Sequence, residues 1–369
     1  MAASFSCGAA AVALLLASVW ADASPQTDKV LKNVRLAPGF RMEVYADDVP
    51  GARSMALGAR GTLFLGTRSG KVYAISPASP GTRAVVRVIA DKLNLPNGVA
   101  FRDGSLYVAE IHRITRYDGI ETSLPNVPAP KLVRDNLPRD RHHGSRYIAF
   151  GPDGKLYVAI GAPCNVCKAP NYGVITRMNA DGSGQEVFAR GVRNTVGFTW
   201  HPDTAELWFT DNGRDYLGDD QPPCELNLAP RAGLDFGFPY CHGKDIKDPD
   251  FGREGDCGKS TPPVQALGAH VAALGVKFYT GEQFPAAYRN RVFIAEHGSW
   301  NRSEKSGYRI TTVKLDGNKA VAYEPFATGF HRGDDVFGRP VDLLVLDDGS
   351  MLVSDDAAGA VYRIAYGAS

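Results

Sequence analysis

The hydrophobic positions of this chain fall into short runs, and one pattern recurs six times. Each copy is a polar or Gly-rich break followed by a β-rich run that ends near a small or acidic residue. The copies are GTLFLGT from Gly61, GSLYVAE from Gly104, GKLYVAI from Gly154, AELWFTD from Ala205, RVFIAEH from Arg291 and GSMLVSD from Gly349. Short apolar runs broken by turn residues, with little periodicity of 3.6 residues, are typical of strands. Most copies precede a second strand pattern, such as KVYAI, RITRY, YRITTVKL or AVYRI. The pattern predicts an all-β protein of six similar units.

The spacing of the units favours a six-bladed β-propeller. Copies recur at intervals of roughly 45 to 85 residues, which suits blades with inserted loops better than short solenoid repeats. The run FRMEVYADDV, which starts at Phe40, precedes the first unit, and the chain closes on AVYRIAY. We expect these two segments to share a sheet and close the ring, because closure removes exposed sheet edges. A two-sheet sandwich is the alternative fold. No Pro- or Ser-rich linker interrupts residues 24–369, which we interpret as one domain.

The first 23 residues have a different pattern. The run SCGAAAVALLLASVW is too short to span a bilayer, and Ala21-Asp22-Ala23 has the small-x-small pattern of a signal peptidase site. We interpret residues 1–23 as a signal peptide, which predicts a periplasmic or secreted protein. No Lys or Arg precedes the apolar run, so a retained anchor is the alternative. No second apolar stretch approaches membrane-spanning length.

Composition narrows the class of protein further. With 369 residues, of which 44% are hydrophobic and 22% charged, the chain can bury a substantial core. Its net charge of +1 provides no concentrated basic field, so neither nucleic acid nor an acidic membrane surface is an expected partner.

Five cysteines follow the signal segment, and export makes disulfides plausible. Cys241 and Cys257 bracket a loop rich in Gly, Asp and Lys, which a covalent link would stabilise, so we predict a disulfide between them. Cys164-x-x-Cys167 indicates either a disulfide or, with Cys224, a zinc site. Lys follows Cys167 where covalent haem attachment would need His.

Candidate chemistry begins at residues 142–167, HHGSRYIAFGPDGKLYVAIGAPCNVC. The GPDG segment is a tight turn between two predicted strands, because Pro fixes φ and Gly supplies a positive φ. His142 and His143 therefore lie on a loop held by a rigid strand pair, where β proteins often keep their functional residues. The alternative is that both are polar loop residues.

Three further stretches place polar groups at strand ends. Arg193 and Asn194 precede the strand GFTW and offer donors suited to anionic ligands. Residues 210–227 form an acidic loop with exposed carbonyls, a hard-oxygen environment suited to calcium. Residues 295–309 contain His297 and Trp300, and Trp300 would either cover a planar or sugar ligand or pack in the fold. The absence of a GxGxxG, P-loop or GxSxG motif removes the usual support for nicotinamide, nucleotide and serine-hydrolase chemistry.

Several of these motifs, taken in order, resemble the glucose/sorbosone dehydrogenase family of quinoprotein sugar dehydrogenases, which are six-bladed propellers. The motifs are HHGSRYIAFGPDGKLYVAIGAPCNVC, GVRNTVGFTWHP, TDNGRDYLGDD, CELN, HVAALG and FIAEHGSWNR. The APCNVC and HGSWNR versions are most similar to the sorbosone-dehydrogenase-like branch, which also resembles the quinone-binding domain of fungal pyranose dehydrogenases. The resemblance extends from about residue 35 to residue 363.

The resemblance implies pyrroloquinoline quinone (PQQ) and Ca²⁺ as cofactors. It implies oxidation of a small-molecule sugar at its anomeric or aldehyde carbon, with an external electron acceptor such as a cytochrome, quinone or dye. The position of His143 relative to GPDG matches the catalytic base. The other matched positions are Arg193 and Asn194 beside the quinone, Asn212 at the cofactor, the Gly213 and Arg214 carbonyls at calcium, and Arg339 at a quinone carboxylate.

The proposed chemistry is coherent. A hydride leaves carbon readily only when the hydroxyl proton is removed, and a neutral imidazole such as His143 can act as that general base. Arg193 would stabilise negative charge on the reduced quinone.

The chain departs from the family pattern at three positions. Cys224 stands where soluble glucose dehydrogenases have an acidic residue, and Val341 stands at a second arginine position. The quinone-binding lysine has no clear counterpart, and Arg302 is the candidate to replace it. Two other function classes stay open: a calcium-dependent lactonase-type hydrolase and a non-catalytic propeller that binds partners.

Overall fold

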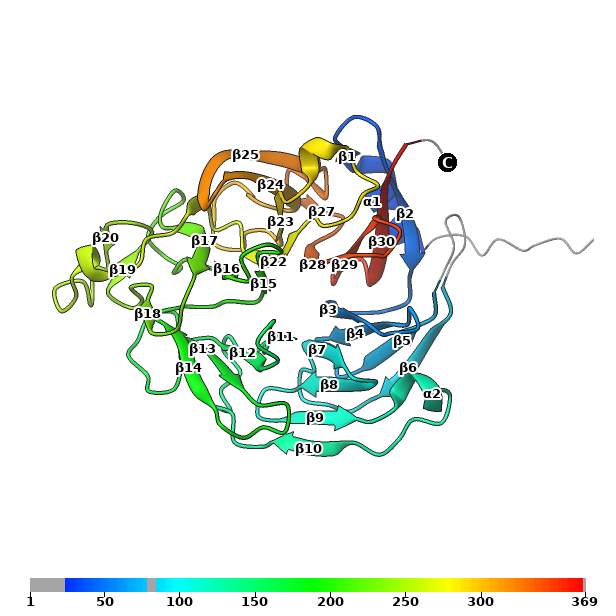
Figure 1. Ribbon diagram of the computed structural model, residues 1–369. Coiled ribbons are helices and arrows are strands. Elements are labelled where there is room, and N and C mark those ends of the chain that lie inside the picture. Colours follow the sequence, from blue (N-terminus) through cyan, green and yellow to red (C-terminus); the bar gives the residue numbers. More distant parts are fainter. Residues whose placement is uncertain (1–23, 78–83, 368–369) are drawn as a thin grey trace, which may run out of the picture.

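Six sheets surround a common axis in the computed structural model, which describes residues 24–77 and 84–367 (Figure 1). The fold is the predicted six-bladed β-propeller, and the sandwich alternative is wrong because the six sheets are separate. The predicted signal peptide, residues 1–23, lies outside the described residues. Within the described ranges, no helix is both long and apolar enough to cross a membrane.

Each blade contains four strands in up-and-down order, and two blades gain a short fifth strand. Blade 1 is β3 (Ala52–Leu57), β4 (Leu63–Thr67), β5 (Val72–Ile75) and β6 (Val86–Ala90). Blade 2 is β7 (Gly98–Arg102), β8 (Ser105–Ala109), β9 (Ile114–Tyr117) and β10 (Lys131–Arg134). Blade 3 is β11 (Ile148–Phe150), β12 (Leu156–Ile160), β13 (Val174–Met178) and β14 (Glu186–Arg190), extended by β18 (Leu234–Asp235).

The remaining blades follow the same order. Blade 4 is β15 (Phe198–Trp200), β16 (Leu207–Asp211), β17 (Pro223–Ala229) and β21 (Gln265–Ala269). Blade 5 is β22 (Ala273–Phe278), β23 (Val292–Glu296), β24 (Arg309–Asp316) and β25 (Lys319–Thr328), extended by β1 (Arg35–Leu36). Blade 6 is β28 (Pro340–Val345), β29 (Met351–Asp355), β30 (Ala360–Tyr366) and β2 (Phe40–Ala46). The six recurring runs of the sequence are the second strands β4, β8, β12, β16, β23 and β29.

The ring closes through the two segments that the sequence indicated. Strand β2 pairs antiparallel with β30, from Phe40 opposite Tyr366 to Ala46 opposite Val361. This sheet joins the beginning and the end of the described chain, so the predicted closure is confirmed.

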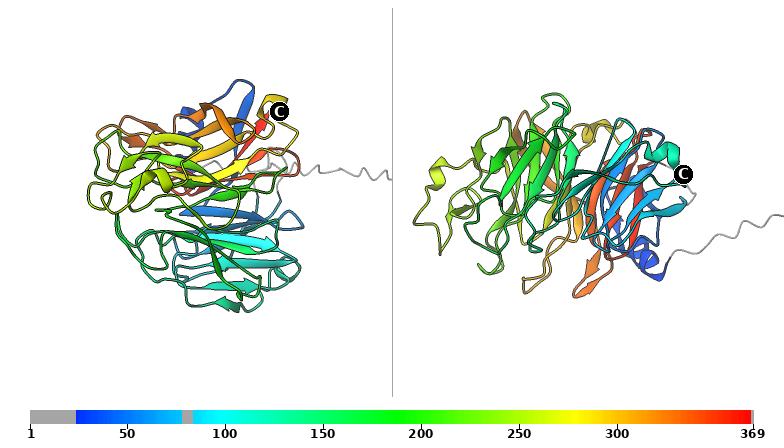
Figure 2. Two further views of the ribbon diagram at one scale, coloured as in Figure 1. Left: turned by 60° about the vertical axis from the view of Figure 1, so that its left-hand side comes forward. Right: turned by 90° about the horizontal axis from the view of Figure 1, so that it is seen from below.

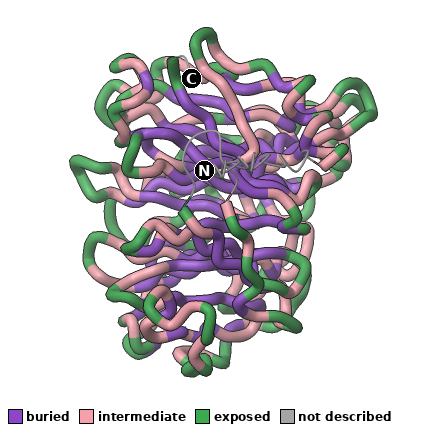
Figure 3. Tube along the Cα trace, turned by 90° about the vertical axis from the view of Figure 1, so that its right-hand side faces the viewer, coloured by how far each residue is buried: buried purple, intermediate pink, exposed green. Residues whose placement is uncertain are grey.

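The hydrophobic core lies between blades. Six large clusters of buried side chains each join two neighbouring sheets, one at every interface around the ring. At the interface of blades 1 and 6, for example, Leu63 and Leu65 pack with Leu352 and Val361. Figure 3 shows the result, with buried strands inside and exposed loops at both ends. The blades are therefore held mainly by apolar contact, while the loops remain available for other roles.

Helices are few, and the sequence pattern did not predict them. Helix α1 (Pro25–Asn33) starts with Ser24, whose hydroxyl accepts the Thr27 N–H at 3.2 Å, and Val30 packs into the core. The other helical turns and small hairpins are α2 (Ile120–Ser123), η1 (Cys257–Lys259), η2 (Ala286–Tyr288), β19 (Cys241–His242) with β20 (Ile246–Lys247), and β26 (His331–Arg332) with β27 (Asp335–Val336). Figure 2 shows the β19–β20 hairpin at the outer edge of the ring.

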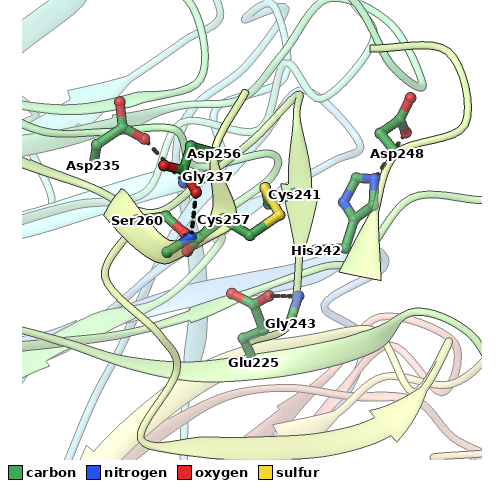
Figure 4. Close-up of a disulfide and its surroundings, with 11 residues drawn as sticks. Glu225, Asp235, Gly237, Cys241, His242, Gly243, Asp248, Asp256, Cys257 and Ser260 are labelled. Carbon is green, nitrogen blue, oxygen red and sulfur yellow. Dashed lines mark hydrogen bonds and ion pairs between the residues drawn. A yellow bond between two sulfur atoms is a disulfide. The ribbon is translucent and has the colours of Figure 1, made fainter. Parts of the chain in front are cut away.

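The structure contains the predicted disulfide between Cys241 and Cys257, with Cα atoms 5.6 Å apart. Figure 4 shows this bond close to Glu225 and the backbone of Gly243. A second disulfide joins Cys164 and Cys167, while Cys224 is a buried free thiol. The zinc alternative is therefore wrong, because two of its three thiols are bonded to each other.

The first prediction concerns the Cys241–Cys257 bond. The double variant Cys241→Ala with Cys257→Ala should lose about 2 to 4 kcal/mol of unfolding free energy, because the unfolded chain regains the freedom that the crosslink removes. Urea unfolding of the variant and the wild-type protein, both without reductant, measures the loss. Equal midpoints would show that this loop is held by its non-covalent contacts.

Candidate functional site

A cavity of about 410 Å³ opens at one end of the propeller. In every blade, the loop before the first strand and the loop after the second strand lie at the same end, because the two strands run antiparallel. Loops flanking all six blades contribute to the cavity. Its lining residues are Arg53, Arg68, Leu95, Ile111, Arg141, His143, Gly144, Ser145, Arg193, Asn194, Val196, Asn212, Gly213, Asp215, Cys224, His270, Ala272, Leu274, His297, Gly298, Trp300, Asn301 and Arg339.

Most of the residues selected from the sequence meet in this cavity. Those that line it are His143, Arg193, Asn194, Asn212, Gly213 and Arg339. Arg214 and Arg302 do not. The buried Arg214 side chain pairs with Asp248, and Arg302 donates to the Asp219 carbonyl and pairs with Asp220 at 3.1 Å.

The His143 imidazole is held in one tautomer. Its Nδ1 lies 2.8 Å from the carbonyl oxygen of Ala162, and a carbonyl can only accept, so Nδ1 carries the proton. Burial lowers the His143 pKa to about 2, and the positive charge of Arg193 adds to this effect. His143 is therefore neutral at physiological pH, with a lone pair on Nε2. Its φ of 47° is unusual for a residue with a side chain, and such backbone strain is common at functional sites.

Two neighbours explain how this loop stays in place. A Cβ on Gly161 would lie 2.6 Å from the Cβ of His143, so only glycine permits this approach. The fully buried Arg146 donates to three main-chain carbonyls, those of Ile111, Pro138 and His143, at 2.7 to 3.3 Å. The sequence pattern did not indicate this supporting role.

Arg193 and Asn194 are fixed by the carboxyl group at the end of β16. Asp211 accepts the backbone N–H of Arg193 at 2.7 Å and that of Asn194 at 2.6 Å. Burial raises the Asp211 pKa to about 6, while these hydrogen bonds favour the ionised form. The Arg193 guanidinium in turn donates to the Asn212 carbonyl at 3.2 Å and pairs with Asp215 at 2.9 Å. Blade 4 therefore fixes both the backbone and the side chain of Arg193.

The opposite wall contains a cluster that the sequence analysis missed. The buried Asp356 carboxylate pairs with Arg53 and Arg68, each at 3.1 Å, and with Nε2 of His297 at 2.8 Å. Burial lowers the pKa of His297 to about 4, even though Asp356 favours its protonation. Arg339 donates to the carbonyls of His297 and Gly298 at 3.1 and 2.9 Å. The sequence did contain a signal for this cluster, which is the position directly after the second strand of a blade. That position is occupied by Arg68, His297 and Asp356, and also by Asn212.

The sequence profile of the Glucose / Sorbosone dehydrogenase family matches residues 129–363, more than half of the chain. The chain belongs to this family. An uncharacterized protein of Borreliella burgdorferi is 35% identical over 357 residues, which cover 92% of each chain.

Solved structures share the fold of this dehydrogenase-family chain at low identity. A calcium structure of a Trichoderma reesei enzyme of carbohydrate-active family AA12 has a TM-score of 0.80 at 18% identity, covering 91% of this chain and 97% of that one. The holo form of the pyranose dehydrogenase PQQ domain from Coprinopsis cinerea has a TM-score of 0.76 at 18% identity, covering 90% and 97%. At these identities the likeness establishes the shared propeller.

The cavity of this family member has a strong positive charge. Five arginines line it: Arg53, Arg68, Arg141, Arg193 and Arg339. Only two aspartates pair with them, Asp215 and Asp356, within the part of the chain that the structure describes. The arginines that line the cavity therefore outnumber the aspartates that pair with them. Such a cavity favours a ligand with several negative charges.

An aromatic pair lies at the rim. Tyr216 and Trp300 are 70% and 66% exposed, and their rings meet edge to face with centroids 5.7 Å apart. Trp300 also lines the cavity. Exposing two large aromatic side chains in contact is unusual for a surface without a ligand.

Beside residues 212–214, two carboxyl groups lie opposite each other on strands β16 and β17. Asp211 pairs in register with Glu225, whose side chain accepts from Gly243 N at 2.7 Å and from Asn227 Nδ2 at 3.0 Å. Burial and the charge of Asp211 raise the Glu225 pKa to about 8. Asn227 Oδ1 has no hydrogen-bond partner, and a turn of the amide would present it to a protonated Glu225.

The second prediction follows from this pKa. The unfolded chain ionises Glu225 near its ordinary value of 4.5, whereas the folded chain keeps the proton until about pH 8. The contribution of the protonated group to stability is thus complete below pH 4.5 and is lost as the pH rises through 8. Glu225→Gln cannot ionise, so its stability relative to wild type should increase between about pH 5 and about pH 9 in urea unfolding. Parallel stability curves would rule out this titration.

Proposed function

We propose that this protein is a PQQ-dependent dehydrogenase that oxidises a sugar at its anomeric or aldehyde carbon and passes the electrons to an external acceptor. The supporting observation is a neutral histidine, His143, with a free Nε2 in a cavity lined by arginines. Two disulfides suit the exported, periplasmic or secreted location that residues 1–23 indicate.

The charge of the cavity fits the quinone. PQQ carries three carboxylates, and the arginines that line the cavity outnumber the aspartates that pair with them. Arg339 donates hydrogen bonds to neutral carbonyls, which leave its positive charge uncompensated. It is therefore a suitable partner for a carboxylate. Arg53 and Arg68 add to the same wall. Asn194 and Asn212 supply polar contacts on the opposite wall.

His143 would act as the general base. The chemistry that PQQ would supply when bound is acceptance of the hydride equivalent that the sugar carbon loses. Nε2 of His143 takes the hydroxyl proton, while the Ala162 carbonyl holds the proton on Nδ1 and stabilises the imidazolium that forms. Arg193, fixed through Asp211, presents a positive charge to the cavity in a geometry that needs no rearrangement.

Calcium would bind to main-chain oxygens at Gly213 and Arg214. A Cβ on Gly213 would lie 2.7 Å from the Pro223 carbonyl oxygen, so the segment packs tightly beside further carbonyls. In the described ranges, no three His, Cys, Asp or Glu side chains converge on one point. Calcium affinity would therefore depend on ligands from the quinone itself.

The sugar would enter past Tyr216 and Trp300, whose exposed rings offer apolar faces to a pyranose ring. Asn301 adds a hydrogen-bond donor here, because its buried Nδ2 has no partner. Arg302 lies behind this rim and would shape the loop through Asp219 and Asp220 instead of contacting the quinone.

The alternatives explain less of the cavity. A lactonase-type hydrolase would need carboxylates around calcium, but Asp219 and Asp220 face Ser303 and Arg302 at the surface. A partner-binding propeller gives no role to a half-buried, strained histidine. Adding PQQ with calcium to the protein should change the quinone absorbance and produce sugar-dependent dye reduction. A protein that binds no PQQ would refute the proposal.

The third prediction tests the base. His143→Ala should retain quinone binding but lower turnover by roughly 10²- to 10⁴-fold, the usual contribution of a positioned base. The matched control is His142→Ala, since His142 is an exposed neighbour with its ring centroid 4.1 Å from that of His143. Steady-state dye reduction at saturating sugar measures both. Equal losses in the two variants, or a loss in the His142 variant alone, would show that His143 is not the base.

The fourth prediction concerns calcium. Because the site would be completed by the quinone, calcium and PQQ should bind with positive coupling. Chelation should release the quinone and abolish activity, and added calcium should restore both. Asp220→Asn, at an exposed side chain, should leave calcium affinity unchanged, whereas Gly213→Ala should weaken it by displacing the backbone. Calcium titrations with and without PQQ measure the coupling, and identical affinities would separate this loop from the cofactor.

A further inference from the structure

The loop after β12, residues 161–168, contains a disulfide to which the proposed chemistry assigns no role. Cys164 and Cys167 enclose only Asn165 and Val166, so the bond closes a very small ring. Both cysteines are partly exposed, in contrast to the buried Cys241 of the other disulfide. A reductant in solution can therefore reach this bond.

Asn165, inside the ring, is the main anchor of the Arg193 side chain. Arg193 Nε donates to the Asn165 carbonyl at 2.8 Å, and Nη2 donates to Asn165 Oδ1 at 2.7 Å. The same Oδ1 accepts Asp215 N at 2.9 Å, and Asn165 Nδ2 donates to the Asp215 carbonyl at 3.1 Å. One asparagine thus orients both the cavity arginine and the backbone of Asp215, the aspartate that pairs with it.

The loop also touches the other half of the site. Ala162 N donates to the Arg193 carbonyl at 2.8 Å, and the Ala162 carbonyl accepts from His143. His143 and Arg193, which come from different blades, therefore both rest on the same short loop. Movement of this loop would change the position of the base and of the cation.

We propose that Asn165 is the positioning residue for Arg193, and that the Cys164–Cys167 disulfide makes this positioning dependent on the redox state of the loop. The inference rests on the proposed function. An external dithiol would break the S–S bond, become a disulfide itself, and deliver two electrons and two protons to give two thiols. The opened loop gains backbone freedom, so Asn165 offers its two acceptors to Arg193 for a smaller fraction of the time.

The consequence is a graded loss of cofactor binding. Hydrogen bonds to a charged guanidinium are among the stronger polar contacts, so losing two of them should weaken PQQ affinity by roughly 10- to 100-fold. Asn165→Ala removes the Oδ1 acceptor but keeps the main-chain carbonyl, so it should reproduce part of this loss with the disulfide intact.

The experiment measures PQQ affinity by absorbance titration in the presence of calcium. The variant Cys164→Ser with Cys167→Ser should bind PQQ as weakly as the wild-type protein treated with dithiothreitol. The matched control is Cys241→Ser with Cys257→Ser, which removes the other disulfide and should leave the affinity unchanged below its unfolding temperature. Adding Asn165→Ala to Arg193→Ala should produce no further loss, because Asn165 acts through Arg193.

The outcomes separate this inference from the proposed function. If wild type binds PQQ and the serine pair and Asn165→Ala bind it equally well, the inference alone is wrong. Additive losses of Asn165→Ala and Arg193→Ala would also overturn it. If wild type binds no PQQ, the proposed function is wrong, and thermal unfolding then decides the positioning role. Non-additive shifts in Tm for the two variants would support the contact, and additive shifts would refute it.

Discussion

The pairing of β2 with β30 is the constraint on which the other features depend. Blade 6 would leave β30 as an unpaired edge strand if β2 did not pair with it. This pairing joins strands more than 300 residues apart in the sequence. Closure fixes the six interfaces, where the apolar clusters lie, and points the same loops of every blade to the same end. Side chains as distant in sequence as Arg53 and Asp356 then meet in one cavity. The site is thus a product of the ring, and no single blade contains it.

Within the cavity, the arginines are held by neutral oxygens more than by acids. Arg339 is fixed by two carbonyls, and Arg193 by carbonyl and amide oxygens as well as Asp215. Carbonyls orient a guanidinium without cancelling its charge, so the cavity keeps a field that a fully paired network would lose. The cost of burying these cations is offset when an anionic ligand arrives. Because backbone carbonyls hold these guanidinium groups, affinity for a polyanion would depend on the geometry of the backbone.

Much of the fold could be predicted because its signal is local. Turn residues and short apolar runs marked the second strand of every blade. Their loops and ends marked His143 and Arg193 as candidates, and the family resemblance added Arg339. Helix α1 was missed because its start depends on Ser24 and on Val30 reaching a core built by distant strands. Asp356 and Asn165 were missed because their importance lies in partners far along the chain. For Arg302 the motif indicated the cavity, whereas the structure pairs its guanidinium with Asp220 at 3.1 Å.

The low pKa of His143 is compatible with the proposed role of this residue as a base once the ligand is considered. Burial and the Arg193 charge keep the imidazole neutral, so the site is ready to accept a proton at any physiological pH. A base with such a low pKa would nonetheless accept protons weakly. An anion bound against Arg193 would cancel the positive field at His143 and raise its proton affinity, since a nearby negative charge favours the imidazolium. Binding would therefore create the basicity that the reaction requires, and the same arginine would first attract the ligand and then, once neutralised, permit the proton transfer.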